Sequence, residues 1–202
     1  MTELSVECCV GPALVPYLDA VARLRIAVFR EWPYLYDGDL DYERRYLATY
    51  SRAAASLCVL VRAGAEIVGA STAVPMADET DEFKQPFIAC GHDPARIFYF
   101  GESVLLPAYR GRGLGRRFFA AREARAHQLG LDYAAFCAVE RAPDDPRRPA
   151  DARSLEAFWQ RQGYTKHPEL NTTYVWKEID EAQPSPKPMT FWLKRLTAAP
   201  EA

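Results

Sequence analysis

The chain has 202 residues, 49% of them hydrophobic and 26% charged, a composition typical of a globular protein and not of a disordered or fibrous one. Lys and Arg number 25 against 27 Asp and Glu, a formal net charge of -2. This excludes a protein-wide basic field for nucleic acid, so any anion site must be local. The length and the even composition predict one domain over residues 1–202.

The first third of the chain predicts two helices and a β-hairpin. Apolar residues recur at helical spacing and then gather in two short runs on either side of Gly64. Helical spacing predicts amphipathic helices, whereas short apolar runs around a glycine turn predict paired strands. The two helices and the two strands are expected at residues 15–31, 41–54, 57–61 and 67–74.

The middle of the chain predicts a loop, a long strand and a glycine-rich turn that opens a helix. Residues 78–95 carry several acidic residues and prolines, which favours a loop or a short helix. The longest strand-like run, residues 97–106, leads directly into the turn over residues 110–115. The helix that follows is expected to end at Gly130, because glycine readily adopts the left-handed conformation of a helix stop.

The last third predicts a buried strand, a proline-rich loop, a helix and terminal strands. Asp151 is a suitable cap for the helix, and the last segment is expected to be either a strand or a helix. These elements are expected at residues 133–139, 141–149, 151–163, 172–176 and 189–196.

The turn from Arg110 to Gly115 has the arrangement in which backbone N–H groups at a helix N-terminus converge on a phosphate. Glycine there lets the backbone approach a pyrophosphate closely. A P-loop does not fit, because Arg116 and Arg117 follow the last glycine where Lys and a hydroxyl residue are required. A dinucleotide-binding fingerprint does not fit either, because Arg116 stands where its third glycine belongs. The alternative is that the glycines only permit tight helix packing.

The pattern formed by Arg110, Gly113 and Gly115, directly after a long strand, resembles motif A of the GNAT acetyltransferases. The segment Trp159 to Tyr164 resembles motif B of the same family. The resemblance covers most of the chain and implies an α/β fold with a mixed, mostly antiparallel central sheet and helices on both faces. It also implies that the protein transfers an acyl group from acetyl-CoA, or another acyl-CoA, to an amine.

The resemblance further implies where the acyl-CoA binds. In this family the strand before motif A separates from its neighbour, and the gap admits the pantetheine arm. Backbone contacts are therefore implied at Val104, Leu105 and Leu106. The turn residues implied to bind the cofactor are Arg110, Gly111, Arg112, Gly113, Leu114 and Gly115.

An amine acceptor arrives protonated, because its pKa is about 10, so the reaction needs a route for one proton to leave. The resemblance places a catalytic glutamate at Glu102, although a hydrogen-bonded strand residue is the alternative. Glu79 lies in an acidic run that is typical of a solvated loop, and Glu140 can pair with Arg141. Both are weaker candidates for the base. The amine is expected to attack directly in a ternary complex, without a covalent enzyme intermediate.

One position departs from the family pattern. The motif B helix usually carries a tyrosine that protonates the leaving thiolate, and Trp159 stands at that position here. An indole has no proton of useful acidity. Tyr164 is taken as the candidate acid, with Tyr133 and Cys137 as other possibilities, or no acid serves.

The acceptor site is expected in the aromatic loop between the first two helices. The resemblance implies that Trp32 and Tyr34 form part of its wall, with Glu79 reaching it from the side, although plain packing is the alternative. A small-molecule or peptide amine is expected. Specificity lies in loops whose shape the sequence does not give.

Two other classes of function remain open. A catalytically inactive acyl-CoA-binding or sensor module is allowed by the departure at Trp159. Nucleic-acid binding through the arginines of residues 110–125 is disfavoured by the net acidic charge. A homodimer is also possible, through packing of Phe191, Trp192 and Leu193 across a partner.

The five cysteines and three histidines show no metal-ligand spacing, so no metal site is expected. The odd number of cysteines, mostly inside apolar runs, favours a reducing compartment. The N-terminal residues lack the features of a secretory leader, and no stretch is long enough to span a bilayer. The expectation is therefore a cytoplasmic protein that does not insert into membranes.

Overall fold

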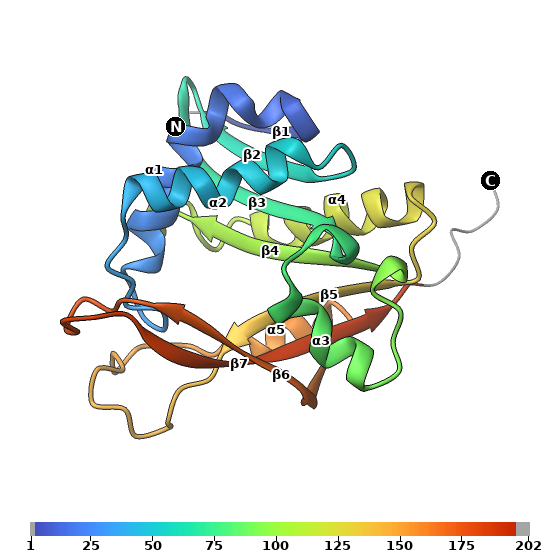
Figure 1. The fold of residues 1–202 in the computed structure, drawn as a ribbon. Coiled ribbons are helices and arrows are strands. Elements are labelled where there is room, and N and C mark those ends of the chain that lie inside the picture. The colour runs from blue at the N-terminus through green and yellow to red at the C-terminus, as the bar shows by residue number, and fades with distance from the viewer. Residues whose placement is uncertain (1–2, 197–202) are drawn as a thin grey trace.

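The computed structural model describes residues 3–196 and shows a seven-stranded sheet with helices packed on both faces (Figure 1). The strand order is β1-β2-β3-β4-β5-β7-β6, and every neighbouring pair is antiparallel except β4 and β5. The mixed, mostly antiparallel sheet expected from the sequence is therefore confirmed. The strands are β1 (Leu4–Val10), β2 (Leu57–Ala63), β3 (Glu66–Pro75), β4 (Ile97–Leu105), β5 (Tyr133–Val139), β6 (Thr165–Trp176) and β7 (Ser185–Arg195).

The helices form a layer on each side of the sheet (Figure 1). Side chains alternate along β5, so that Ala135 and Cys137 pack in the core under α1, α2 and α3, while Ala134 and Phe136 pack in the core under α4 and α5. Short 3₁₀ segments cover residues 11–17, 76–78, 94–96 and 107–109. The α-helices are α1 (Leu18–Phe29), α2 (Leu40–Arg52), α3 (Asp81–Ala89), α4 (Leu114–Gln128) and α5 (Glu156–Arg161).

Two irregularities in β4 shape the middle of the sheet. Ser71 of β3 lies opposite Ser103, but Ala73 lies opposite Phe100, so β4 carries one extra residue in a β-bulge. On its other side, β4 pairs with β5 only as far as Tyr99. Beyond Tyr99 the two strands separate, while β5 continues along β7. The parallel pair therefore opens into a gap next to the bulge.

The C-terminal part differs from the sequence-based expectation in two places. The helix expected from Asp151 covers only Glu156–Arg161, because residues 151–155 form turns and Ser154 Oγ accepts a hydrogen bond from the Glu156 N–H. A second proline-rich loop is expected from the sequence at Pro184, Pro186 and Pro188, but residues 185–188 are instead the first part of β7, which pairs there with β6 before it reaches β5. A strand can contain prolines where the side without N–H groups has no neighbouring strand.

Candidate active site

A cavity of about 80 Å³ lies under α1 and α2, beside the gap between β4 and β5. Its walls are mostly aromatic, and its only charged side chains are Arg25, Glu43 and Glu102. The lining also includes Gly101 of β4 and Cys137 of β5, the two strands that separate there. The aromatic lining residues are Phe29, Tyr34, Tyr36, Tyr42, Tyr46, Phe83, Tyr99, Tyr174 and Trp176.

Glu102 lies on the β4 bulge and lines this cavity. Its carboxylate is buried, and Oε2 lies 2.5 Å from Arg25 Nη1 and accepts a hydrogen bond from the Tyr46 hydroxyl at 3.3 Å. Among the described residues Oε1 has no hydrogen-bond partner. Oε1 is therefore the atom that is available to a ligand. The neighbouring Gly101 must be glycine, since a Cβ there would lie 2.0 Å from the Tyr50 hydroxyl.

Arg25 is fully engaged. Its guanidinium pairs with both Glu43 and Glu102, and it lies over the rings of Phe29 and Tyr46, 5.0 and 4.2 Å from their centroids. Two carboxylates therefore share one cation, and the polar part of the cavity carries one uncompensated negative charge.

Arg122 supports the bulge from the opposite face of the sheet. This buried side chain of α4 donates to the carbonyls of Thr72 and Glu102 and to Ser103 Oγ. Burial lowers its pKa to about 10. The guanidinium thus ties β3 to the distorted part of β4 and fixes the backbone that carries Glu102.

The aromatic loop before α2 supplies one wall of the cavity. Tyr34 packs against Phe29 and Trp176, and its backbone carbonyl accepts hydrogen bonds from Trp176 Nε1 and Arg141 Nη2. Trp32 does not line the cavity and lies instead against the Arg141 guanidinium. Of the two aromatic residues expected at the acceptor site, only Tyr34 is placed in its lining.

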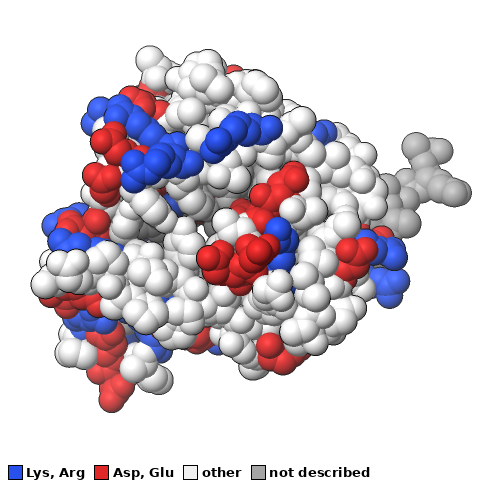
Figure 2. Space-filling model, in the orientation of Figure 1, with Lys and Arg blue, Asp and Glu red and all other residues white. Residues whose placement is uncertain are grey.

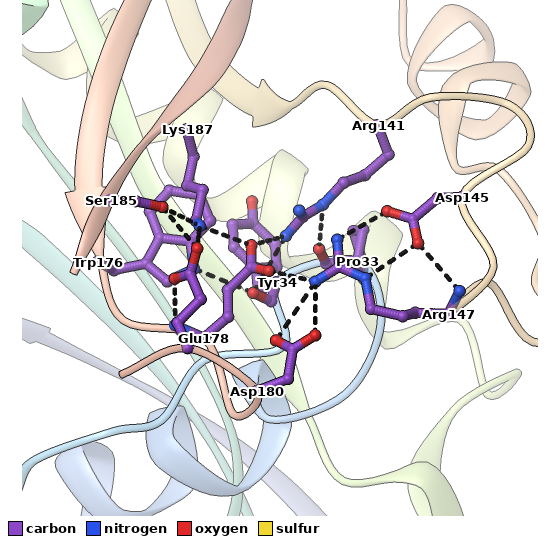
Figure 3. Close-up of polar contacts among 11 residues, drawn as sticks. Pro33, Tyr34, Arg141, Asp145, Arg147, Trp176, Glu178, Asp180, Ser185 and Lys187 are labelled. Atoms are coloured by element: carbon purple, nitrogen blue, oxygen red, sulfur yellow. Dashed lines mark hydrogen bonds and ion pairs between the residues drawn. The ribbon is translucent and has the colours of Figure 1, made fainter. Parts of the chain in front are cut away.

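A buried ionic cluster holds this wall (Figure 3). Glu178, which is 1% exposed, lies 2.6 Å from Arg141, 2.5 Å from Arg147 and 3.3 Å from Lys187. Arg141 also donates to the carbonyls of Pro33 and Tyr34. The cluster therefore joins the loop before α2, the loop after β5 and the β6–β7 connection.

The glycine-rich turn leads into α4 as the sequence predicts. Gly111 and Gly113 both have positive φ, and Gly113 caps the helix without any side-chain hydrogen bond. The first turn of α4 has no acidic residue, and neither Arg116 nor Arg117 makes an ion pair within residues 3–196. Because basic groups at a helix N-terminus oppose the helix dipole, this arrangement fits a bound anion such as a pyrophosphate.

Other residues of the turn have different surroundings. Arg110 pairs with Glu31 and donates to the Leu105 carbonyl, and Arg112 donates to the Ala108 carbonyl. At Gly115, a Cβ would lie 3.2 Å from Phe158, so this glycine also permits close packing of α5. The packing role therefore falls on Gly115, whereas no backbone of residues 3–196 lies close to the Cβ positions of Gly111 and Gly113.

The edge of β4 that faces the gap offers backbone groups. The Leu106 N–H is bonded to the Val68 carbonyl, on the side of β3. Since successive amides in a strand point to opposite sides, the Leu105 N–H is directed toward the gap, whereas that of Val104 is directed toward β3. Of the three strand residues expected to contact the cofactor, Leu105 is the one whose N–H is placed for it.

The remaining candidate residues lie away from the cavity. Tyr164 is buried on the α4 side, where its hydroxyl donates to Glu123, and burial raises its pKa. Trp159 packs against Phe136 and Trp192. Glu140 pairs with Lys166 at 2.7 Å. None of these residues is among those that line the cavity.

Two buried groups on the cavity side have raised pKa values. Burial raises the pKa of the Cys137 thiol to about 12, which makes it a poor nucleophile at neutral pH. Burial also raises the pKa of Glu79 to about 6. Glu79 does not line the cavity and instead accepts a hydrogen bond from the Tyr50 hydroxyl at 3.3 Å.

Sequence reasoning missed Arg25, Glu43, Tyr46 and Trp176 as site residues. Arg25 could have been found from the sequence, because it lies on the apolar face of α1 between buried Leu24 and partly buried Val28. A charged residue on a buried helix face is rare unless it is paired. The other three become site residues only through contacts with distant segments.

Further structural features bear on the expected partners. The face drawn in Figure 2 carries basic and acidic side chains in separate small groups, without a continuous basic field. Within residues 3–196, no helix combines the length and apolarity needed to cross a membrane. The same part of the chain contains no cluster of three His, Cys, Asp or Glu residues suited to a metal ion.

Comparison with known proteins relates the fold to a family. Residues 23–164 match the model of the acetyltransferase (GNAT) family. Solved structures share the fold over nearly the whole chain. An N-acetyltransferase from Staphylococcus aureus Mu50 has a TM-score of 0.62 at 12% identity, covering 96% of this chain and 99% of that one.

Two more solved structures extend this comparison. A ribosomal-protein-alanine N-acetyltransferase from Brucella melitensis has a TM-score of 0.60 at 13% identity over 95% of this chain and 99% of its own. A Salmonella typhimurium protein described as an acetyltransferase, solved with its cofactor acetyl-CoA, has a TM-score of 0.57 at 14% identity over 98% of both chains. No curated protein matches the chain.

Proposed function

Because this chain belongs to the GNAT acetyltransferase family, we propose that it transfers the acetyl group of acetyl-CoA to a small primary amine bound in the aromatic cavity. The observation that carries the proposal is the separation of β4 from β5 directly beside the cavity, at the bulge where Glu102 lies. This arrangement brings a cofactor gap and a buried carboxylate to the same point.

The residues around the gap have distinct roles in this proposal. The turn over residues 110–115 and the N-terminus of α4 bind the pyrophosphate of acetyl-CoA, which supplies the acetyl group. The Leu105 N–H polarises the thioester carbonyl. Glu102 takes the proton of the amine, which then attacks directly. A thiol leaving group has a pKa of about 8.5 and needs little help from an acid.

The charge of the cavity favours an acceptor without a carboxylate. Glu43 and Glu102 leave one negative charge uncompensated, and Arg25 is occupied by both of them and by two rings. A substrate carboxylate would therefore find no free cation, whereas an ammonium group would be attracted by the carboxylates and by the aromatic walls. We infer that the acceptor is an apolar amine and not an α-amino acid.

Binding of acetyl-CoA is the first test, by calorimetry on the wild type and on two matched variants. Gly113→Glu and Gly130→Glu introduce the same charge at positive φ, with no backbone obstacle at either position, but Gly130 lies at the other end of α4. Micromolar affinity is expected for the wild type and for Gly130→Glu, and is expected to be lost in Gly113→Glu. Equal affinities in both variants would contradict the anion site.

Release of free CoA thiol then tests the acceptor with matched compounds. Isoamylamine and leucine differ only by the carboxylate on the carbon that bears the amine. The kcat/KM for isoamylamine is expected to exceed that for leucine by about 100-fold or more, because like charges in a buried site repel strongly. Equal kcat/KM values for the two compounds would contradict the inferred acceptor class. Acetyl-CoA binding without turnover of any amine would instead leave an acyl-CoA-binding module.

A further inference from the structure

Three buried side chains and the partly buried Tyr46 form a continuous chain of hydrogen bonds that leads away from the cavity. The Tyr46 hydroxyl is 3.3 Å from Glu102 Oε2, the Tyr46 and Tyr50 hydroxyls are 3.0 Å apart, and the Tyr50 hydroxyl is 3.3 Å from Glu79 Oε1. Tyr46 and Tyr50 are four residues apart on α2, so they lie on one helix face. The chain begins at a lining residue of the cavity and ends at Glu79, outside it.

Making all three links at once takes one more proton than the two phenols supply. Three oxygen-to-oxygen links each need one proton, but Tyr46 and Tyr50 provide only two. If both carboxylates were ionised, each phenol would donate to its own glutamate, and two bare oxygen lone pairs would face each other across the 3.0 Å link. One of the two carboxyl groups must therefore be protonated for all three links to be made.

The surroundings assign the extra proton to Glu79. Glu102 is ion-paired with Arg25, whereas Glu79 is in no ion pair within the described part of the chain. The charged and titratable groups around Glu79 come from five elements. They are Tyr46 and Tyr50 of α2, Lys84 of α3, Tyr99 and Glu102 of β4, Cys137 of β5 and Tyr174 of β6.

Among these groups only Lys84 is a cation, and it is already paired with Asp81. Burial is the main cause that raises the pKa of Glu79 to about 6. When Glu79 is protonated, below about pH 6, it donates to Tyr50, Tyr50 donates to Tyr46, and Tyr46 donates to Glu102. Above that pH Glu79 is ionised and accepts a hydrogen bond from Tyr50.

We propose that Glu102, Tyr46, Tyr50 and Glu79 form a proton relay that carries the proton of the acceptor amine from the cavity to solvent. The proposal rests on the proposed function and adds to it a destination for the proton. Glu79 is 8% exposed but lies between exposed Asp78 and Thr80, so its carboxyl group is close to water. The relay thus gives the proton of the amine a route that does not pass through the mouth of the cavity.

One turnover of the relay conserves every proton. Above about pH 6 Glu79 starts ionised, and Glu102 accepts a proton from the ammonium group. From Oε2, the oxygen bonded to Tyr46, Glu102 passes this proton to Tyr46, Tyr46 passes its own proton to Tyr50, and Tyr50 passes its own proton to Glu79. Glu79 then releases a proton to water. The resting arrangement is restored, and one proton has moved from the amine to solvent. Tyr50 and Glu79 act through Glu102 and lie outside the cavity lining, whereas Tyr46 also lines the cavity.

The test compares the pH dependence of kcat for isoamylamine in the wild type, Glu79→Gln, Tyr50→Phe and Tyr42→Phe. Tyr42 is the matched control, because it lies on the same face of α2 and its hydroxyl bonds another phenol, that of Tyr174, outside the relay. Below about pH 6 Glu79 stays protonated and blocks the transfer, so the wild-type kcat is expected to fall there.

Glu79→Gln and Tyr50→Phe are expected to lower kcat by about tenfold or more. They are also expected to remove the fall of kcat below about pH 6, which is the acidic limb of the profile. Tyr42→Phe is expected to keep the limb, whatever its effect on KM. A kcat profile in Glu79→Gln that matches the wild type would overturn the relay. A lower kcat with an unchanged limb would also overturn it, since that result indicates a structural role only.

A second measurement is independent of turnover, so it separates the relay from the proposed function. Infrared difference spectra of the protein alone should show a protonated carboxyl band that disappears as pH rises through about 6. The band should be absent in Glu79→Gln and should titrate at a different pH in Tyr50→Phe. A wild type without this band would overturn the relay even if acetyl transfer is found. If the band is present but no acetyl transfer is found, the protonation of Glu79 is supported and the proposed transferase activity is contradicted.

Discussion

At the scale of single residues, Arg25 sets the chemistry of the cavity. It comes from a helix that otherwise packs into the core, and it meets one carboxylate from α2 and another from β4. A buried guanidinium between two carboxylates holds both side chains in place. It also occupies Oε2 of Glu102, so that Oε1 is the carboxylate oxygen without a hydrogen-bond partner among the described residues.

The role of Glu102 is tested by a substitution that keeps its shape. Glu102→Gln is expected to lower kcat for isoamylamine by about 100-fold, because general base catalysis is lost, and to leave the affinity for acetyl-CoA unchanged. Glu43→Gln is the matched control, since Glu43 contacts the same arginine, and it should lower kcat less. Steady-state kinetics and calorimetry provide both readouts. A Glu102→Gln enzyme with the wild-type kcat would exclude Glu102 as the base.

The raised pKa of Glu79 also leads to a prediction about the free energy of unfolding. Its pKa is raised from 4.5 to about 6 in the folded state, so the stability that it contributes is present below about pH 4.5 and is lost as pH rises through about 6. Glu79→Gln should therefore raise the free energy of unfolding by about 1–2 kcal/mol at about pH 8 and change it little at about pH 4. Urea denaturation at both values measures this. A variant that is less stable at the higher pH would contradict it.

At the scale of elements, β4 divides its hydrogen-bonding groups between two tasks. Before the bulge it is a regular inner strand, paired on both sides, and after the bulge only β3 remains bonded to it. Backbone amides that face the gap are left for a ligand, which is how a strand at the centre of a sheet can bind an extended chain. The bulge and the separation of β5 therefore act together to leave backbone amides of β4 unpaired.

Amide hydrogen exchange can distinguish the two edges of β4. Without ligand, the Leu105 N–H should exchange much faster than that of Leu106, because only the latter is bonded to a carbonyl, that of Val68. Saturation with acetyl-CoA should slow Leu105 and leave Leu106 nearly unchanged. Exchange measured by NMR resolves the two amides. Equal protection of both residues in the unliganded protein would contradict the placement of the Leu105 N–H.

At the scale of the whole molecule, the cavity depends on segments that are far apart in the sequence. Tyr34, Arg141, Trp176 and Glu178 meet at one wall (Figure 3). Because each of these contacts joins a different loop or strand, the size of the cavity is a property of the assembled fold. Loss of one central group should therefore disturb the acceptor site without reaching the cofactor turn.

Glu178→Gln tests this dependence. Removing one partner from a buried ionic cluster is expected to cost about 3 kcal/mol of unfolding free energy and to raise the KM for the amine by about tenfold, with the KM for acetyl-CoA unchanged. Glu181→Gln is the matched control. Glu181 pairs with Lys187 at the more exposed edge of the same cluster, so its loss should cost less than about 1 kcal/mol. Equal effects of the two substitutions would contradict a central role for Glu178.

The sequence predicted the sheet and the glycine-rich turn before α4 because their signals are local. A long apolar strand, three spaced glycines and a helical pattern are contiguous, and they needed no knowledge of the rest of the fold. Arg25 with Glu102, and Tyr34 with Trp176, meet across large separations in sequence, so no local pattern could pair them. The prolines at positions 186 and 188 misled the prediction, because their effect depends on which side of β7 has a neighbour.

The place of β7 in the sheet has a consequence for how the protein is made. This strand is the last of the seven in sequence, yet it inserts between β5 and β6, and its Met189 lines the cavity. During synthesis the cavity therefore cannot form until residues 185–195 are available, and until then β5 presents an unpaired edge. Such non-local pairing slows folding and exposes aggregation-prone edges. Formation of the cavity is thus expected to follow the synthesis of all seven strands.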